Sequence, residues 1–172
     1  FIKSNMNKSA LFLALNIGLI TSFLSCISGN AEKKLFYEGV LFEYPQSWTV
    51  ETNELPGESY SIKGKEGNNI IFITFTEKST DLKEVIETHQ RNVDRTKFEY
   101  SAEKIIPSKF GKYDALSSKF TIVRDSKKSY GNTFALKAGN KSYLIIMQSD
   151  TEDNLNKSFE TIKNSFEINT KP

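Results

Sequence analysis

Short apolar runs alternate with turn signals over residues 39–77. The runs cover residues 40–44, 48–51, 60–63 and 70–75, and Pro, Gly, Asn and Ser lie between them. Runs of this length that are rich in Ile, Phe, Tyr and Val are typical of β-strands. The pattern predicts an antiparallel meander in the first half of the domain.

The apolar spacing changes from a strand period to a helical period after Asp81. The apolar positions that follow at helical spacing are Leu82, Val85, Ile86, His89 and Val93. Asp81 stands three residues before Glu84, which is typical of a helix N-terminal cap, and Ser79 and Thr80 are neighbouring cap candidates. We therefore predict a helix over residues 81–97.

Strand character returns after this helix. The expected strands cover residues 103–106, 115–123, 130–137 and 143–148, with the long ones in the middle of the sheet. A capping-box pattern at residues 149–152 then opens a second helix, whose apolar positions are Leu155, Phe159, Ile162 and Phe166. Two helices and about seven or eight strands predict the α+β class, an antiparallel sheet flanked by helices.

The N-terminal segment, residues 1–25, has the layout of a secretory signal peptide. Starting at Met6, a basic stretch leads into an apolar run over residues 10–24 that ends at Ser25. The run is about fifteen residues, short of the roughly 20 that a permanent membrane helix needs. Residues 23–26, Phe-Leu-Ser-Cys, resemble a bacterial lipobox, in which the cysteine thiol carries diacylglycerol and becomes the new N-terminus. Cys26, the only cysteine, is therefore the expected lipid attachment site.

The lipobox has larger residues at Phe23 and Leu24 than the usual pattern. Ordinary signal-peptidase cleavage after Ala31 is therefore the alternative. With lipidation, residues 26–38 form the lipidated N-terminus and a polar tether, and residues 39–169 form the domain. The expected location is the bacterial cell envelope, with the domain anchored to a membrane and facing the periplasm or the exterior.

The charge of the expected mature chain is balanced. The whole sequence has 23 basic and 21 acidic residues, and Lys3 and Lys8, which lie before Cys26, account for the difference. No basic stripe is left to attract nucleic acid, so that partner is not expected. A single cysteine also excludes an internal disulfide framework, so the fold depends on packing of its 13 Phe, seven Tyr and one Trp.

The sequence contains no recognisable catalytic constellation. His89 is the only histidine, and no thiol, second histidine or evident acidic partner accompanies it, so a packing role is expected rather than general-base catalysis. The acidic residues Glu152 and Asp153 fit a helix start better than a calcium site. Serine-hydrolase, P-loop and dinucleotide-binding signatures are absent. We therefore predict no catalytic residue, no metal site and no cofactor.

Residues 42–50 (FEYPQSWTV) and 159–166 (FETIKNSF) resemble the PsbP-like superfamily. That group includes photosystem II PsbP proteins, the Ran-binding protein Mog1 and bacterial DcrB-type lipoproteins. The resemblance spans residues 39–168 and implies a PsbP/Mog1-like α/β/α sandwich. In it, Pro45 would turn the chain and Trp48 would anchor the core, and the residues of the last helix that would pack on the sheet are Phe159, Ile162 and Phe166.

Members of this superfamily serve as accessory or adaptor proteins. The resemblance therefore implies a membrane-tethered envelope lipoprotein that is not an enzyme and binds a protein partner. The alternative is a soluble periplasmic or secreted ligand-binding protein, or a hydrolase without a recognisable motif. A protein contact surface would favour the first, and a concave pocket with converging polar groups would favour the second.

Overall fold

The structure is a computed structural model that describes residues 32–55, 59–76, 78–94 and 98–169. The predicted signal peptide, Cys26 and the first residues of the predicted tether lie outside these described residues. The described strands are β1 (Glu32–Tyr37), β2 (Val40–Pro45), β3 (Thr49–Leu55), β4 (Ser59–Glu66), β5 (Asn69–Thr76), β6 (Glu99–Ala102), β7 (Ile106–Phe110), β8 (Tyr113–Arg124), β9 (Lys127–Ala138), β10 (Lys141–Ser149) and β11 (Glu167–Ile168). The described helices are α2 (Leu82–Asp94), α3 (Glu152–Lys157) and α4 (Glu160–Ser165).

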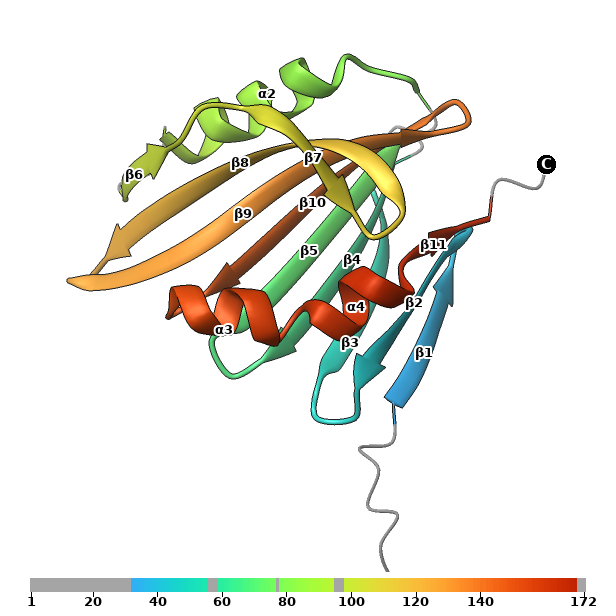
Figure 1. Ribbon diagram of the computed structural model, residues 1–172, viewed down its shortest axis with the longest axis horizontal. Helices are drawn as coiled ribbons and strands as arrows, with labels where there is room; N and C mark the ends of the chain where they lie inside the picture. Colours follow the sequence, from blue (N-terminus) through green and yellow to red (C-terminus); the bar gives the residue numbers. More distant parts are fainter. Residues whose placement is uncertain (1–31, 56–58, 77, 95–97, 170–172) are drawn as a thin grey trace, which may run out of the picture. The chain divides into compact units, whose positions relative to one another are not determined.

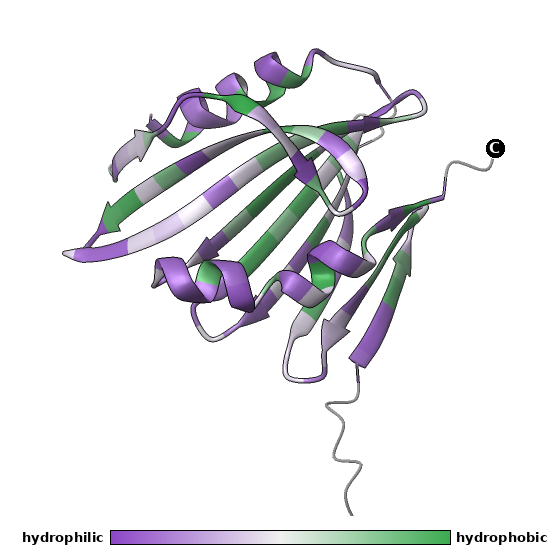
Figure 2. Cartoon of the chain, in the orientation of Figure 1, coloured by the Kyte–Doolittle hydropathy of each residue, from purple (hydrophilic) through white to green (hydrophobic). Residues whose placement is uncertain are grey.

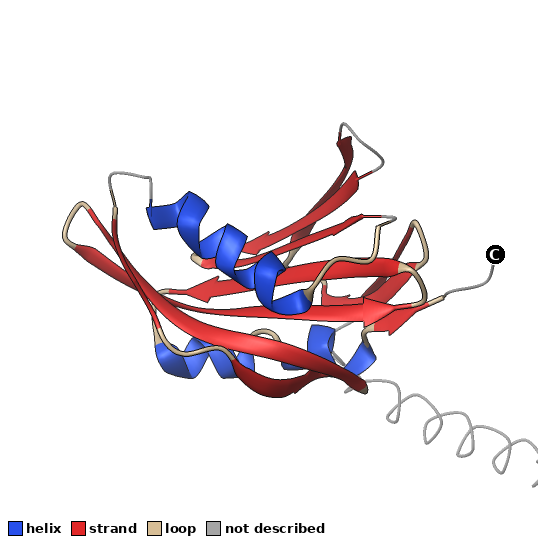
Figure 3. Ribbon diagram, turned by 90° about the horizontal axis from the view of Figure 1, so that it is seen from above, coloured by secondary structure: helices blue, strands red, loops and turns tan. Residues whose placement is uncertain are grey.

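The strands form two antiparallel sheets (Figure 1). The large sheet has the order β3-β4-β5-β10-β9-β8-β6, and β7 also pairs with β8; the small sheet has the order β1-β2-β11. Helix α2 lies on one face of the large sheet, and the short helices α3 and α4 lie on the other (Figure 3). This arrangement confirms the predicted α+β class, an antiparallel sheet flanked by helices.

The main core lies on the α3 and α4 side of the large sheet. Alternate residues of β5, Ile71, Ile73 and Phe75, are buried on this side, because successive side chains of a strand point to opposite faces. The small sheet contributes Val40 and Phe42, which are fully buried. Apolar residues are accordingly dense along the central strands, whereas the helices carry hydrophilic outer faces (Figure 2). Burial of this apolar surface is the main stabilising contribution to the fold.

The first strand lies inside the range that the sequence analysis assigned to a tether. β1 pairs with β2 in continuous register, from Glu32 opposite Pro45 to Tyr37 opposite Val40. Leu35 and Tyr37 pack against the main core, and Phe36 between them is exposed. Residues 32–37 are therefore part of a sheet, because alternate apolar residues of a largely polar segment suffice to hold an edge strand.

The strand predicted at residues 103–106 is wrong. β6 ends at Ala102 and β7 begins at Ile106, and both pair with the same edge of β8. Ala102 lies opposite Phe120 and Ile106 lies opposite Ser117, so the β6–β7 side has one more residue than β8 between these pairs. An extra residue of this kind interrupts the ladder as a bulge does.

The single C-terminal helix expected after residue 152 is divided into two short helices. Thr151 caps α3, and its hydroxyl accepts a hydrogen bond from the Asn154 N–H at 3.1 Å. Phe159 stands between α3 and α4 with φ −105° and ψ 0°, outside the helical range. The division keeps Leu155, Phe159 and Ile162 all buried on the sheet, since each is at most 6% exposed.

The predicted helix at residues 81–97 is described as α2, over Leu82–Asp94. Asp81 Oδ1 accepts a hydrogen bond from the Glu84 N–H at 3.0 Å, which is the cap that the sequence pattern predicts. Residues 95–97 lie outside the described part of the chain.

Candidate functional site

The two faces of the large sheet are covered unequally. Helix α2 packs on β6, β8, β9 and β10, and it leaves the same face of β5, β4 and β3 partly exposed. Side chains on this uncovered part, which we call the open face, include Ile70 and Phe72 of β5 and Lys63 of β4. Phe72 lies between Lys63 and Ile146 in register, so apolar and charged side chains are neighbours across the strands. The open face is the first of two candidate features in the described part of the chain.

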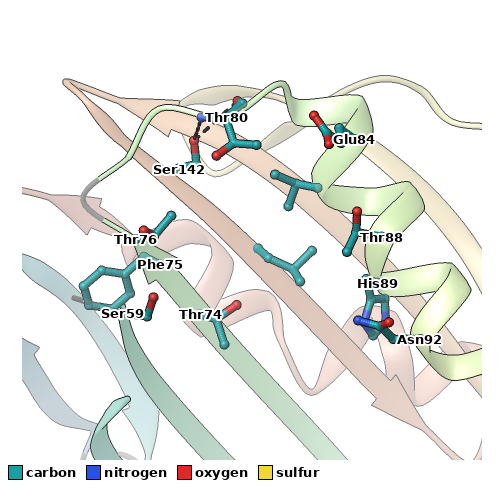
Figure 4. Close-up of a pocket in the computed structure, with 12 residues that line it drawn as sticks. Ser59, Thr74, Phe75, Thr76, Thr80, Glu84, Thr88, His89, Asn92 and Ser142 are labelled. Carbon is teal, nitrogen blue, oxygen red and sulfur yellow. Dashed lines mark hydrogen bonds between the residues drawn. The ribbon is translucent and has the colours of Figure 1, made fainter. Parts of the chain in front are cut away.

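A groove of about 340 Å³ lies where α2 borders the open face (Figure 4). One wall comes from α2, with Glu84, Thr88, His89 and Asn92, and the other wall comes from strand residues such as Thr74. The remaining lining residues come from β4, β5, β10 and the start of α2: Ser59, Phe75, Thr76, Thr80, Val85, Ser142 and Leu144. Its volume lies at the lower end of the range for small-molecule sites.

Several polar groups of the groove have unused hydrogen-bonding capacity. Within the described residues, no hydrogen bond engages the side chains of Thr74, His89 or Asn92. Thr88 Oγ1 accepts from the Arg91 guanidinium at 2.8 Å, and Thr76 Oγ1 accepts from the Lys78 N–H at 3.4 Å. Each of these two hydroxyls therefore keeps its own proton to donate.

At one end of the groove, hydrogen bonds already join the residue Thr80 to Ser142 of β10. Ser142 Oγ accepts from the Thr80 N–H at 2.8 Å and faces the Thr80 carbonyl at 3.5 Å, as the dashed lines in Figure 4 mark. These contacts tie the start of α2 to β10. They fix the distance between the helix wall and the strand wall at this end.

The groove is lined by one carboxylate, one histidine and otherwise neutral side chains. Burial lowers the pKa of His89 below its ordinary value, because the charged imidazolium loses hydration there. Glu84 is the only Asp, Glu, Lys or Arg among the lining residues. The groove therefore presents neutral donors and acceptors with a single carboxylate.

His89 packs in an aromatic cluster with Phe120 and Tyr100. The His89 ring lies 6.5 Å from the Phe120 ring of β8, and the Phe120 ring lies 5.7 Å from that of Tyr100. The Phe120 ring crosses over Gly131 of β9, where any Cβ would collide with it. Burial raises the pKa of Tyr100 to about 12, with a smaller contribution from Asp94. His89 thus combines the expected packing role with a place in the groove wall.

The motif residues taken from the family resemblance lie on the opposite face of the sheet. Pro45 ends β2, and its carbonyl accepts from the Trp48 N–H at 3.0 Å. Trp48 is 2% exposed and meets the Phe159 ring edge-to-face at 5.3 Å. Ile162 and Phe166 are buried in the same core. None of these side chains lines the groove, so the structure separates them from the candidate site.

Metal-ligating side chains do not gather at one place in the described residues. No cluster of three or more His, Cys, Asp or Glu side chains that could hold a metal ion occurs among them. Glu84 and His89 both line the groove, five residues apart on α2, and no nucleophile is hydrogen-bonded to either within the described chain. No helix in the described part of the chain has the length and apolar character to cross a bilayer.

The sequence analysis missed Thr74, Thr88 and Asn92 as candidate binding residues. Strand alternation places Thr74 on the face opposite Ile73, and helical spacing places Thr88 and Asn92 on one side of α2. Those two patterns were readable from the sequence. The position of α2 on the sheet, which places Thr74 on one wall of the groove and Thr88 and Asn92 on the other, could not be predicted from the sequence.

The α+β fold of the described residues, an antiparallel sheet flanked by helices, is similar to the fold of PsbP. The solution structure of cyanobacterial PsbP (CyanoP) from Synechocystis sp. PCC 6803 is similar to this chain with a TM-score of 0.60 and 13% identity, covering 86% of this chain and 99% of CyanoP. A crystal structure of a protein from Bacteroides thetaiotaomicron has a TM-score of 0.56 and 15% identity, covering 81% of this chain. The chain spans about half, 49%, of that protein's length.

A third similar structure is LpqN, described as involved in cell envelope biogenesis of Mycobacterium tuberculosis. It has a TM-score of 0.48 and 11% identity, and the match covers 80% of this chain and 90% of LpqN. No family model and no curated protein matches the sequence. At these identities the likeness to CyanoP and to the Bacteroides protein establishes the fold alone, and the function has to be argued from the surface of this chain.

Proposed function

We propose that this chain is a cell-envelope lipoprotein, anchored through Cys26, which acts as a non-enzymatic accessory module and binds a protein partner on its open face. The observation that carries the proposal is the half-covered sheet: α2 packs on β6, β8, β9 and β10, and partly exposed apolar side chains remain on β5. Apolar surface that is bordered by polar residues is typical of protein contact sites.

The anchor is supported by the sequence before β1. The apolar run ends at Cys26, which is the only cysteine of the chain. Residues 27–31 separate Cys26 from β1, and an extended chain of this length spans at most about 20 Å. A lipid on Cys26 would therefore keep the domain close to the bilayer, where a partner in the same membrane would be met at a high local concentration.

The contact surface is supported by the residues around Phe72. Phe72 and Ile70 lie on the open face, and Lys63, Lys65 and Glu51 border them on β4 and β3. Charges of both signs at the border match the balanced charge of the mature chain. Such a border favours a protein partner of mixed charge rather than a polyanion.

Two measurements test the two parts of the proposal. For the anchor, the intact mass of the protein from the membrane fraction of a bacterial host is compared between the wild type and Cys26→Ala. We expect a diacylglycerol adduct on a chain that begins at Cys26, abolished by the substitution. A soluble product that begins at Glu32 would rule out the anchor.

For the contact surface, a photo-crosslinking phenylalanine analogue is placed at Phe72 in the native host, with Asn156 of α3 as the control position. The replacement at Phe72 keeps an aromatic ring, so the fold is retained, and Asn156 is exposed on the opposite side of the sheet. We expect a discrete protein adduct from position 72 and none from position 156. Equal adducts from both positions, or none from either, would contradict the proposed surface.

A further inference from the structure

Half of the residues that line the groove beside α2 carry hydroxyl groups. Its lining contains six Ser and Thr side chains, together with the amide of Asn92 and the imidazole of His89. A hydroxyl both donates and accepts hydrogen bonds, and so does an amide. A lining of this kind is matched by a ligand whose own groups also donate and accept, which is the property of a polyhydroxylated molecule.

The backbone around the groove excludes one common type of ligand. β5 is paired on both sides, with β4 and β10, and β10 is paired with β5 and β9. A peptide that binds by strand addition needs a free strand edge, and the floor of the groove offers none. Strand addition is therefore ruled out as the mode of recognition at this groove.

The charge of the lining argues against a second class of ligand, the anions. Glu84 is the only charged lining residue, so a phosphate or carboxylate ligand would meet repulsion and no compensating cation. The imidazole of His89 is held among apolar neighbours and does not supply that positive charge. A neutral ligand fits this lining best.

The apolar part of the lining is the larger part of its exposed surface. Val85 of α2 and Leu144 of β10 face the same space. A pyranose ring presents C–H groups on its faces and hydroxyls around its rim, so it can contact both kinds of surface at once. The volume of about 340 Å³ suits a small ligand.

We propose that the groove between α2, β5 and β10 binds an uncharged saccharide, with Thr74 and Asn92 as two of its hydrogen-bonding residues. This inference goes beyond the proposed accessory function and depends neither on the anchor nor on the protein partner. Thr74 and Asn92 are chosen because they face each other from the strand wall and the helix wall, and neither has a hydrogen-bond partner in the described residues.

The test is saturation-transfer NMR on the full chain purified from host membranes. The probes are maltotriose and chitotriose, with trialanine and inorganic phosphate as the competing ligand classes. The variants are Thr74→Val and Asn92→Ala. Thr52→Val is the matched control, since Thr52 is an exposed threonine of β3 that lies opposite the buried Ile62, outside the groove.

We expect saturation transfer to at least one trisaccharide, and an affinity about fivefold weaker in each groove variant, because one net hydrogen bond contributes about 1 kcal/mol. The Thr52→Val variant should bind as the wild type does. Absence of transfer to both saccharides would overturn the proposal, as would equal affinity in all three variants. Binding of trialanine or phosphate in place of the saccharides would assign the groove to a different ligand class. None of these outcomes bears on the Cys26 adduct or on crosslinking at Phe72, so the two proposals fail separately.

Discussion

Replacement of Gly131 by alanine tests the contact that supports the helix wall of the groove. Gly131 lies on β9 directly opposite Phe120 of β8. A Cβ at this position would collide with Phe120 Cζ and with both Cε atoms of the same ring. The ring must therefore move, and it is held between His89 and Tyr100.

The sign of the effect depends on two opposing contributions. Forcing a methyl group into a packed site costs about 1–3 kcal/mol. Replacing glycine by alanine at a backbone conformation that alanine can adopt stabilises by about 0.4–1 kcal/mol through the unfolded chain, and Gly131 does not have a positive φ. We expect Gly131→Ala to lower the free energy of unfolding by about 1–2 kcal/mol.

The assay is urea unfolding of the wild type, Gly131→Ala, Phe120→Leu and the double variant. Leucine lacks the three ring atoms that approach Gly131, so Gly131→Ala should be neutral or slightly stabilising in the Phe120→Leu background. The cycle then gives a coupling free energy of at least about 1 kcal/mol, which distant residues do not show. An equal cost of Gly131→Ala in both backgrounds would refute the steric argument.

Three further predictions use the same unfolding measurement. Thr151→Ala should cost about 1 kcal/mol, because it removes the α3 cap on the Asn154 N–H, and an unchanged midpoint would contradict that cap. Gly111→Ala should cost more than about 2 kcal/mol, because φ is +56° and a Cβ would lie 2.6 Å from the Lys163 carbonyl; a cost below that of Thr151→Ala would contradict it. The lowered pKa of His89 means that the folded state binds a proton on His89 less readily than the unfolded state does. The stabilising contribution of neutral His89 is therefore fully present above the ordinary pKa of 6.5, and it is lost as the pH falls through the lower pKa of the folded state. The pH dependence across that window should be smaller in His89→Gln, and an identical pH profile would show that burial of His89 is not its cause.

Helix α2 and the central strands were predictable because their signals are local. Asp81 and the apolar positions after it specify both the cap and the period of the helix, and alternate burial along β5 follows from its continuous β-prone run. The fold class required only the number and order of these elements. It was therefore accessible from the sequence.

The errors have non-local causes. β1 exists because Leu35 and Tyr37 find a core built by residues far along the chain. The gap between β6 and β7 is set by pairing with β8, where Ser118 Oγ donates to the Glu103 carbonyl at 2.7 Å and the Glu103 N–H donates to the Lys119 carbonyl at 2.8 Å. Phe159 divides the last helix so that its ring reaches Trp48. None of these contacts leaves a pattern within its own segment.

The groove is a consequence of the dimensions of the elements that cover the sheet. Strands are about 4.8 Å apart and an α-helix with its side chains is about 10–12 Å wide, so one helix covers roughly two or three strands. α2 is the only described helix on its face, and it lies over β10, β9, β8 and β6. On this face, the strands beyond α2 must then either carry polar side chains or be covered by a ligand or a partner. Beside α2, the strand β5 carries the polar side chains Thr74 and Thr76, whereas Ile70 and Phe72 farther along the same face are apolar. This contrast is the reason to expect a small polar ligand in the groove and a protein partner on the open face.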